Sequence, residues 1–160
     1  MVEPNKTYFV NLTSPTNATI GRAQAIGTIT DNDNTLLFTL PPCRIVDTAG
    51  PPGPSGGPAM AANTTRIFPA AGLCGVPTTA KAVAVIVTTS QQTDFGDLRV
   101  YHADGALPGA STINFVANHA RANNAIVPLG TAGRISITCD MPPGSSGTTR
   151  VIVDVYGYFE

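Results

Sequence analysis

The sequence is short of several residue types, and each shortage excludes a class of protein. It has no tryptophan, two histidines and 12% charged residues, and its nine basic and ten acidic residues leave a net charge of -1. A nucleic-acid-binding protein needs a basic stripe, and none is present because Lys and Arg occur singly. No apolar run approaches the roughly 18 residues of a membrane-spanning helix, so membrane insertion is not predicted. Val2, Glu3 and Pro4 follow Met1 without a signal-peptide pattern, which suggests that the sequence begins within a longer protein.

Cysteine is also scarce. The three cysteines are Cys43, Cys74 and Cys139, and no two of them form a CxxC pair, which makes a zinc ribbon improbable. Two interpretations stay open at this point. One disulfide plus a buried thiol would fit an exported protein, whereas three reduced core cysteines would fit a reducing compartment.

What the sequence does contain is typical of β-structure. Hydrophobic residues make up 42% of the chain, largely Val, Ile, Ala and Leu, and there are 16 glycines and 14 prolines. Strand-like runs occur at 7–12, 25–30, 35–40, 43–47, 64–68, 80–89, 97–102, 111–116, 125–129, 134–139 and 149–159. About eight short strands in some 120 residues predict an antiparallel, jelly-roll-like β-sandwich. We therefore expect two parts, a pair of strands at 1–34 and a β-sandwich at 35–160.

Local patterns give more specific expectations. The run at 80–89 is apolar on both faces, which predicts a central strand. Pro41 and Pro42 are expected to end the strand at 35–40, and the Pro- and Gly-rich segment 49–63 is expected to be a surface loop without regular structure. The polar stretch 121–124 predicts a turn, with Arg121 as a candidate ion-pair partner of Asp154 or Asp47.

The first 33 residues resemble the C-terminal end of a Calx-beta domain, a β-sandwich module of sodium/calcium exchangers and many bacterial surface proteins. The segments VEPNKTYFVNL, SPTNATI and GTITDND carry this resemblance, which covers only the last third of such a domain. In the exchangers, acidic residues after the last strand bind calcium, so the resemblance implies a calcium site at Asp31 and Asp33. Calcium requires six to eight oxygen ligands, and the alternative is a solvated linker that ends the strand.

Residues 42–160 resemble a second module, found in secreted and cell-surface proteins of environmental bacteria. The matching phrases are PCRIVDT, GLCGVP, AKAVAV, GDLRVYHADG, STINF, RANNAIVPLG and VIVDVYGYF. The resemblance implies a non-catalytic, extracellular role as an adhesive, spacer or glycan-contacting module, and it transfers no catalytic residue. Two strands without a domain of their own also predict strand addition to a neighbouring surface domain or to a second copy, which would make a homo-oligomer.

An enzyme is the competing hypothesis, as expected for a fragment recovered from environmental DNA. If the strands at 97–102 and 111–116 paired as a hairpin, the imidazoles of His102 and His119 would approach one end of a sheet. A zinc ion bound there could activate water for the hydrolysis of activated esters or phosphoesters. The candidate ligands are the histidines His102 and His119 and a carboxylate from Asp97, Asp104 or Asp140. Apart from zinc here and calcium at Asp31 and Asp33, no cofactor is predicted.

Three other motifs are weaker. Residues 53–57 match the letters GxSxG, but the surrounding prolines make Ser55 an ordinary loop serine rather than a nucleophile. Cys139 beside Asp140 resembles a nucleophile and base, yet strand alternation places Cys139 on an apolar face and favours burial. Tyr101 or Tyr156 would have to supply the platform for a bound sugar, because the sequence has no tryptophan.

Overall fold

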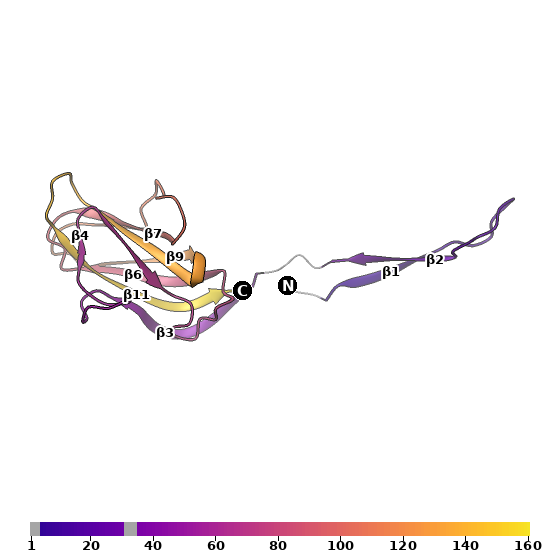
Figure 1. Cartoon of the computed structure of the whole chain (residues 1–160), viewed down its shortest axis with the longest axis horizontal. Helices are drawn as coiled ribbons and strands as arrows, with labels where there is room; N and C mark the ends of the chain where they lie inside the picture. Colours follow the sequence, from indigo (N-terminus) through magenta and orange to yellow (C-terminus); the bar gives the residue numbers. More distant parts are fainter. Residues whose placement is uncertain (1–3, 31–34) are drawn as a thin grey trace. The chain divides into compact units, whose positions relative to one another are not determined.

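The computed structural model describes residues 4–30 and 35–160, and the chain divides into two compact units, Met1–Leu36 and Leu37–Glu160. The first unit is an antiparallel hairpin of β1 (Lys6–Asn11) and β2 (Gln24–Ile29) (Figure 1). Its register places Lys6 opposite Ile29 and Asn11 opposite Gln24. Both strands were predicted, and the observed bounds differ from the prediction by one residue.

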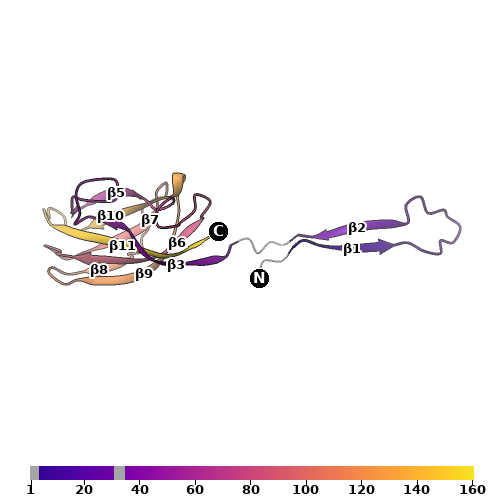
Figure 2. The same cartoon turned by 90° about the horizontal axis from the view of Figure 1, so that it is seen from below.

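The second unit is an antiparallel β-sandwich, as the sequence predicts. Its strands are β3 (Leu37–Asp47), β4 (Met60–Ala61), β5 (Thr64–Pro69), β6 (Ala82–Ser90), β7 (Gly96–His102), β8 (Ile113–Phe115), β9 (Arg121–Pro128), β10 (Arg134–Asp140) and β11 (Thr148–Phe159), with a short 3-10 turn, η1 (Thr131–Gly133). One sheet has the order β3-β11-β6-β9, with β4 added to β11, and the other has the order β5-β10-β7-β8 (Figure 2). No helix in the described residues is long and apolar enough to cross a membrane.

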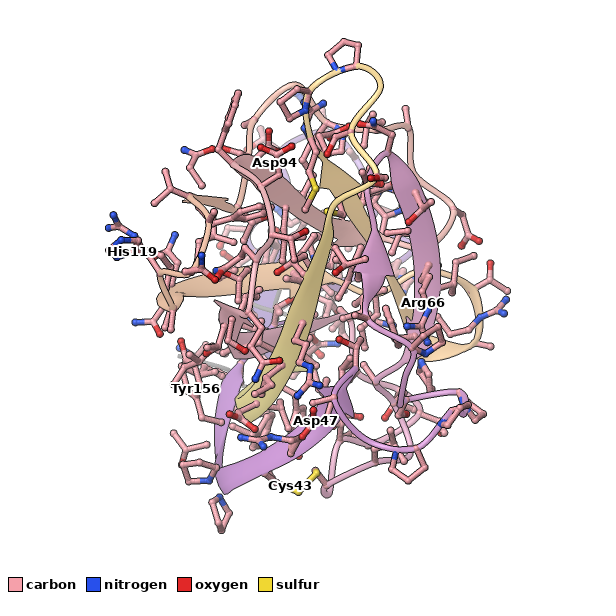
Figure 3. All side chains as sticks on the ribbon, turned by 90° about the vertical axis from the view of Figure 1, so that its left-hand side faces the viewer. Cys43, Asp47, Arg66, Asp94, His119 and Tyr156 are labelled. Atoms are coloured by element: carbon pink, nitrogen blue, oxygen red, sulfur yellow. A yellow bond between two sulfur atoms is a disulfide. The ribbon has the colours of Figure 1, made fainter. Side chains whose placement is uncertain are left out.

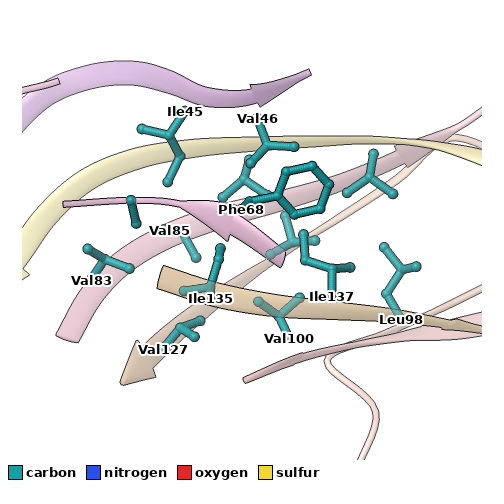
Figure 4. Close-up of a cluster of buried hydrophobic side chains, with 14 of the residues drawn as sticks. Ile45, Val46, Phe68, Val83, Val85, Leu98, Val100, Val127, Ile135 and Ile137 are labelled. Carbon is teal, nitrogen blue, oxygen red and sulfur yellow. The ribbon is translucent and has the colours of Figure 1, made fainter. Parts of the chain in front are cut away.

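The core lies between the two sheets and consists mainly of branched aliphatic side chains (Figure 4). Alternate residues of β6 and β11 point inward, and β10, β7 and β5 cover them from the other side. Fully buried members are Val83, Val85, Val87, Val151, Val153, Val155, Ile135, Ile137, Leu98 and Phe68. Strand β6 lies between β11 and β9, so the prediction of a central strand at 80–89 is confirmed.

The prediction that Pro41 and Pro42 end a strand is wrong. Strand β3 continues through both prolines to Asp47. Its pairing with β11 shifts at this point, since Val155 lies opposite Cys43 while Gly157 lies opposite Thr39. Strand β3 is an edge strand, and Pro41 and Pro42 lie within the shift, where no residue of β11 is paired with them.

The Pro- and Gly-rich segment 49–63 is also more ordered than predicted. It contains strand β4, which pairs with β11, and Met60 of that strand is fully buried. Arg66 of β5 holds the segment by donating hydrogen bonds to the carbonyl oxygens of Pro58 at 2.6 Å and Gly56 at 2.7 Å. A side chain from the sandwich therefore fixes a segment whose own composition favours a loop.

The expected turn at 121–124 is instead the start of β9. Strand β9 is an edge strand of its sheet, so its polar side chains reach solvent and are not desolvated. Asn123 also donates a hydrogen bond to the Thr112 carbonyl at 2.8 Å. The predicted ion pair of Arg121 is also wrong. Arg44 of β3 occupies that role, with Nε 2.9 Å from Asp154 Oδ1 and Nη1 3.2 Å from Asp47 Oδ2.

The structure decides between the two interpretations of the cysteines. Cys43 of β3 and Cys74, in the loop after β5, form a disulfide, and Cys139 of β10 is a buried free thiol. The disulfide joins an edge strand of one sheet to the loop that leaves the edge strand of the other sheet. That loop carries Val76 into the core, so the bond closes one end of the sandwich.

Candidate functional site

An open groove of about 640 Å³ lies on the second sheet, where β7 begins and β10 ends. This volume falls within the range of roughly 300–1,000 Å³ typical of ligand pockets. The lining residues come from three places in the sequence: Phe95, Gly96 and Asp97; Asn114, Phe115 and Val116; and Asp140, Met141, Pro142 and Pro143. Most of its wall is therefore apolar, with a small number of polar side chains.

The polar side chains form a row across three strands. Asp97 of β7 lies opposite Asp140 of β10 on one side and opposite Asn114 of β8 on the other. Directly opposite residues of an antiparallel pair project from the same face, so these three side chains are neighbours. Phe95, in the loop just before β7, lines the same groove, and 60% of the residue is exposed. The groove thus sets an exposed aromatic ring beside a polar row.

Arg99 fixes both carboxylates of the row. Its Nε lies 3.2 Å from Asp97 Oδ1 and 3.2 Å from Asp140 Oδ2, and its Nη1 donates to the Pro108 carbonyl at 3.1 Å. The Nε–H hydrogen bond goes to Asp97, and Asp140 Oδ2 is buried without a hydrogen bond of its own. Since the Asp140 side chain is 31% exposed, its accessible surface belongs to its remaining atoms, including Oδ1. Each carboxylate therefore turns one oxygen toward Arg99.

The rim of the groove is held by hydrogen bonds. Asp94 accepts from the Phe95 backbone N–H at 2.8 Å and from Ser145 Oγ at 2.7 Å, which ties the loop before β7 to the loop after β10 (Figure 3). The Met141 N–H donates to Asn63 Oδ1 at 3.1 Å. Gly96 is required here, because a Cβ at this position would lie 2.1 Å from the Asp140 carbonyl oxygen. These contacts fix the loops that form the rim of the groove.

The zinc site predicted from the histidines does not form. Strands β7 and β8 do pair, as that hypothesis required, but Gly96 lies opposite Phe115, so the chain leading to His119 starts beside the first residue of β7. His102 is the last residue of β7, six residues away, or about 20 Å at 3.3 Å per residue. His119 points outward from the sandwich (Figure 3). The described residues contain no group of three His, Cys, Asp or Glu side chains able to hold a metal ion.

Asp104, the third residue of that hypothesis, has a structural contact instead. Its Oδ2 accepts a hydrogen bond from the Thr131 backbone N–H, which connects the β7–β8 loop to η1. That hydrogen bond is the main cause of the lowered pKa of Asp104, followed by the Thr131 side chain, and the positive charge of Arg134 adds to both. The carboxylate therefore anchors a loop. Asp31 and Asp33 lie outside the described residues, and calcium binding there stays a prediction.

The predicted burial of Cys139 is confirmed, because this residue is 0% exposed. Burial, together with the negative charges of Asp140 and Asp97, raises the pKa of the thiol to about 12. A thiol with this pKa has almost no thiolate at neutral pH and is a poor nucleophile. Ser55 lies in the turn of segment 49–63, where its carbonyl accepts from the Asp47 N–H at 2.8 Å.

We expect Cys139 to resist a thiol reagent as long as the sandwich is folded. With 5,5′-dithiobis(2-nitrobenzoic acid) at pH 8, the native protein should show no reactive thiol, and the protein in guanidinium chloride should show the single free cysteine. Reaction of the native protein at the rate of the denatured one would show that Cys139 is accessible, contrary to its position in the structure.

The tyrosines proposed as sugar platforms are not the most exposed rings. Tyr101 is half-buried, and its hydroxyl shares a hydrogen bond of 3.1 Å with Thr138 Oγ1. Tyr156 is half-buried where the pairing of β11 shifts on both sides. Phe95 is the most exposed aromatic residue of the described sandwich. Its exposure could not be predicted from sequence, because a lone Phe in a loop, unlike a residue in a strand, belongs to no pattern that indicates where the side chain points.

No protein-family model and no curated protein matches the sequence. The solved structures to which this chain is similar include two of the Tobacco streak virus coat protein. A 2.1 Å structure has 12% identity and a TM-score of 0.36, and it covers 78% of this chain and 88% of that one. A structure of the coat protein dimer has 10% identity and a TM-score of 0.35, and it covers 80% and 90%. Scores this low say nothing about function.

Proposed function

We propose that the chain is a non-catalytic structural or adhesive module of a secreted or bacterial cell-surface protein, which self-associates through its β1–β2 hairpin. The observation that carries this proposal is the exposure of the hairpin. None of residues 4–30 is buried, and six large apolar residues are about half exposed or more: Tyr8, Phe9, Val10, Leu12, Ile26 and Ile29. An isolated two-stranded hairpin is marginal in water, so these side chains require a partner surface.

The two faces of the hairpin differ. Tyr8, Val10, Ala25 and Ile29 project from one face, where the Tyr8 ring lies across Gly27 and Lys6, opposite Ile29, is the one charged residue. We call this the apolar face. On the opposite face, a single apolar pair, Phe9 and Ile26, is surrounded by polar residues: Thr7, Thr28, Asn11 and Gln24, of which Gln24 donates to Asn11 Oδ1 at 2.8 Å. An apolar face on one side and a mostly polar face on the other is the pattern of a sheet that is buried on one side.

A second copy of the hairpin can cover the exposed apolar side chains of β1 and β2. Each copy offers an apolar face and two strand edges. Copies that pack face to face bury the same apolar patch from each, and copies that pair edge to edge extend the hairpin to a sheet of at least four strands. Strand addition of this kind gains backbone hydrogen bonds as well as apolar burial. The resemblance of these strands to the end of a Calx-beta domain, a surface-protein module, supports the same proposal.

The disulfide between Cys43 and Cys74 supports the extracellular part of the proposal. Disulfides of this kind form and persist in oxidising compartments, among them the periplasm, the cell surface and the medium. The low charge content and the threonine- and glycine-rich loops agree with a passive role in a surface protein.

The test is a charge placed on the apolar face. Val10→Lys should shift the 160-residue protein toward the monomer in multi-angle light scattering, because it replaces an apolar contact of this face with a charge that self-association would bury. Thr7→Lys is the matched control, since it puts the same charge on the polar face of the same strand and should leave the assembly unchanged. Deletion of residues 1–33 should also give a monomer, as the sandwich has its own core. A wild-type protein that is monomeric at all concentrations would overturn the self-association.

A further inference from the structure

We infer that the groove on the second sheet binds a neutral pyranose sugar of a polysaccharide chain. This inference deepens the adhesive role proposed above and rests on it, because an adhesive module requires a ligand. The site consists of the Phe95 ring, the apolar rim of Val116 and Pro142, and the polar row of Asp97, Asn114 and Asp140.

The chemistry of the wall matches the two kinds of surface that a pyranose presents. A pyranose ring has a face of C–H groups and an equatorial belt of hydroxyls. Phe95, 60% exposed and next to Val116 and Pro142, offers a flat apolar surface for the C–H face. The polar row lines the same groove as this surface, so it offers hydrogen-bonding atoms to the hydroxyls of a sugar stacked on the ring.

The polar atoms of the row are held in place but not saturated. Arg99 occupies one oxygen of each carboxylate and leaves the second oxygen of Asp97 and of Asp140 as acceptors for sugar hydroxyls. Asn114 is exposed, and its carboxamide makes no hydrogen bond within the described part of the chain, so it offers both a donor and an acceptor. Hydroxyl donors to carboxylates form charge-assisted hydrogen bonds, which are stronger than neutral ones.

Charge selects the kind of sugar. Two carboxylates against the single guanidinium of Arg99 make the row negative, which disfavours uronic acids and other anionic sugars. A basic peptide is the other ligand that a negative groove would accept. It gains less here, because Arg99 already pairs with both carboxylates, which are only 22% and 31% exposed. The ion pairs of Arg99 do not weaken the binding of a neutral sugar, since sugar hydroxyls require hydrogen-bond acceptors rather than a net negative charge.

The experiment is native affinity electrophoresis in gels that contain one polysaccharide each. The probes are xyloglucan, galactomannan and a mixed-linkage β-glucan as neutral chains, and polygalacturonate as an anionic chain. We expect at least one neutral polysaccharide to retard the protein and polygalacturonate to have no effect. Phe95→Ala should weaken the retardation about tenfold, and Asn114→Ala several-fold, from the loss of stacking and of one or two hydrogen bonds.

Ile126→Ala is the matched control. Ile126 is 64% exposed on β9, an edge strand of the other sheet, so its removal deletes as much exposed apolar surface without touching the groove. This variant should be retarded as the wild type is. The inference is overturned if no neutral polysaccharide retards the protein, if Phe95→Ala is retarded as much as Ile126→Ala, or if only oligolysine or polyproline peptides bind in a Phe95-dependent manner.

The same samples separate this inference from the proposed function. Absence of sugar binding in a protein whose assembly still depends on Val10 would overturn the ligand and leave the self-association intact. Sugar binding by a wild-type protein that is monomeric would overturn the self-association and leave the groove as the adhesive site.

Discussion

Replacing Phe68 by alanine should lower the free energy of unfolding by about 3–5 kcal/mol, the usual cost of removing a buried phenyl ring. Phe68 of β5 is fully buried and lies in the space between the two sheets (Figure 4). The guanidinium carbon of Arg66 lies 4.7 Å from the centroid of its ring, so the substitution also removes the surface on which Arg66 rests. Because domains of this size have a total stability of about 5–15 kcal/mol, the loss is a large fraction of it.

Urea denaturation followed by circular dichroism measures this change. Phe95→Ala provides the matched control, because it makes the same substitution at a ring that is 60% exposed. It should change the stability by no more than about 0.5 kcal/mol. Equal losses in the two variants would mean that Phe68 does not lie in the core described here. The control also shows whether the groove variant is folded well enough for the sugar-binding test.

Strand positions were predictable because alternation of side chains is a local property. Val83, Val85 and Val87 point to one face, and the same alternation in β11 identifies both strands from sequence alone. The prediction that β6 is central also follows from composition, since both faces of this strand are apolar. The fold class therefore followed from residues that are close together in sequence.

Pairing was not predictable, because it depends on residues far apart. Pro41 and Pro42 stop a strand by every local rule, yet β3 passes through them at a shift in its pairing with β11. Asn123 and Asn124 favour a turn locally, yet they lie in an edge strand beside β6. Tertiary pairing outweighed local preference in both segments.

The candidate site could not be predicted for the same reason, because it depends on the pairing of strands that are far apart in sequence. The hypothesis that β7 and β8 pair was right, but the register, which no local pattern specified, separates His102 from His119. The groove needs three segments, at 95–97, 114–116 and 140–143, and only the sheet order brings them together. Asp97 and Asp140 were named from sequence as metal ligands, and in the structure they share Arg99 instead.

Removal of the disulfide is expected to have an effect of similar size to the loss of Phe68. Cys43 and Cys74 are 31 residues apart, and cross-linking a loop of this length removes conformational entropy from the unfolded chain worth roughly 3–4 kcal/mol. The double variant Cys43→Ser/Cys74→Ser should lose about this much stability. The loss should be accompanied by local opening, because the bond closes the end of the sandwich where the loop after β5 carries Val76 into the core.

Reduction of the wild type provides an independent route to the same state. Wild-type protein in dithiothreitol and the double variant should have the same urea midpoint, and dithiothreitol should not change the midpoint of the double variant, whose only remaining cysteine is the buried Cys139. If the reduced wild type is as stable as the oxidised one, the bond contributes nothing to folding. Faster hydrogen exchange at the Val76 amide, which donates to the Leu73 carbonyl at 2.9 Å, would locate the opening in the loop that the disulfide holds. An oxidising environment would then be a condition for this fold at full stability, as the proposed surface location requires.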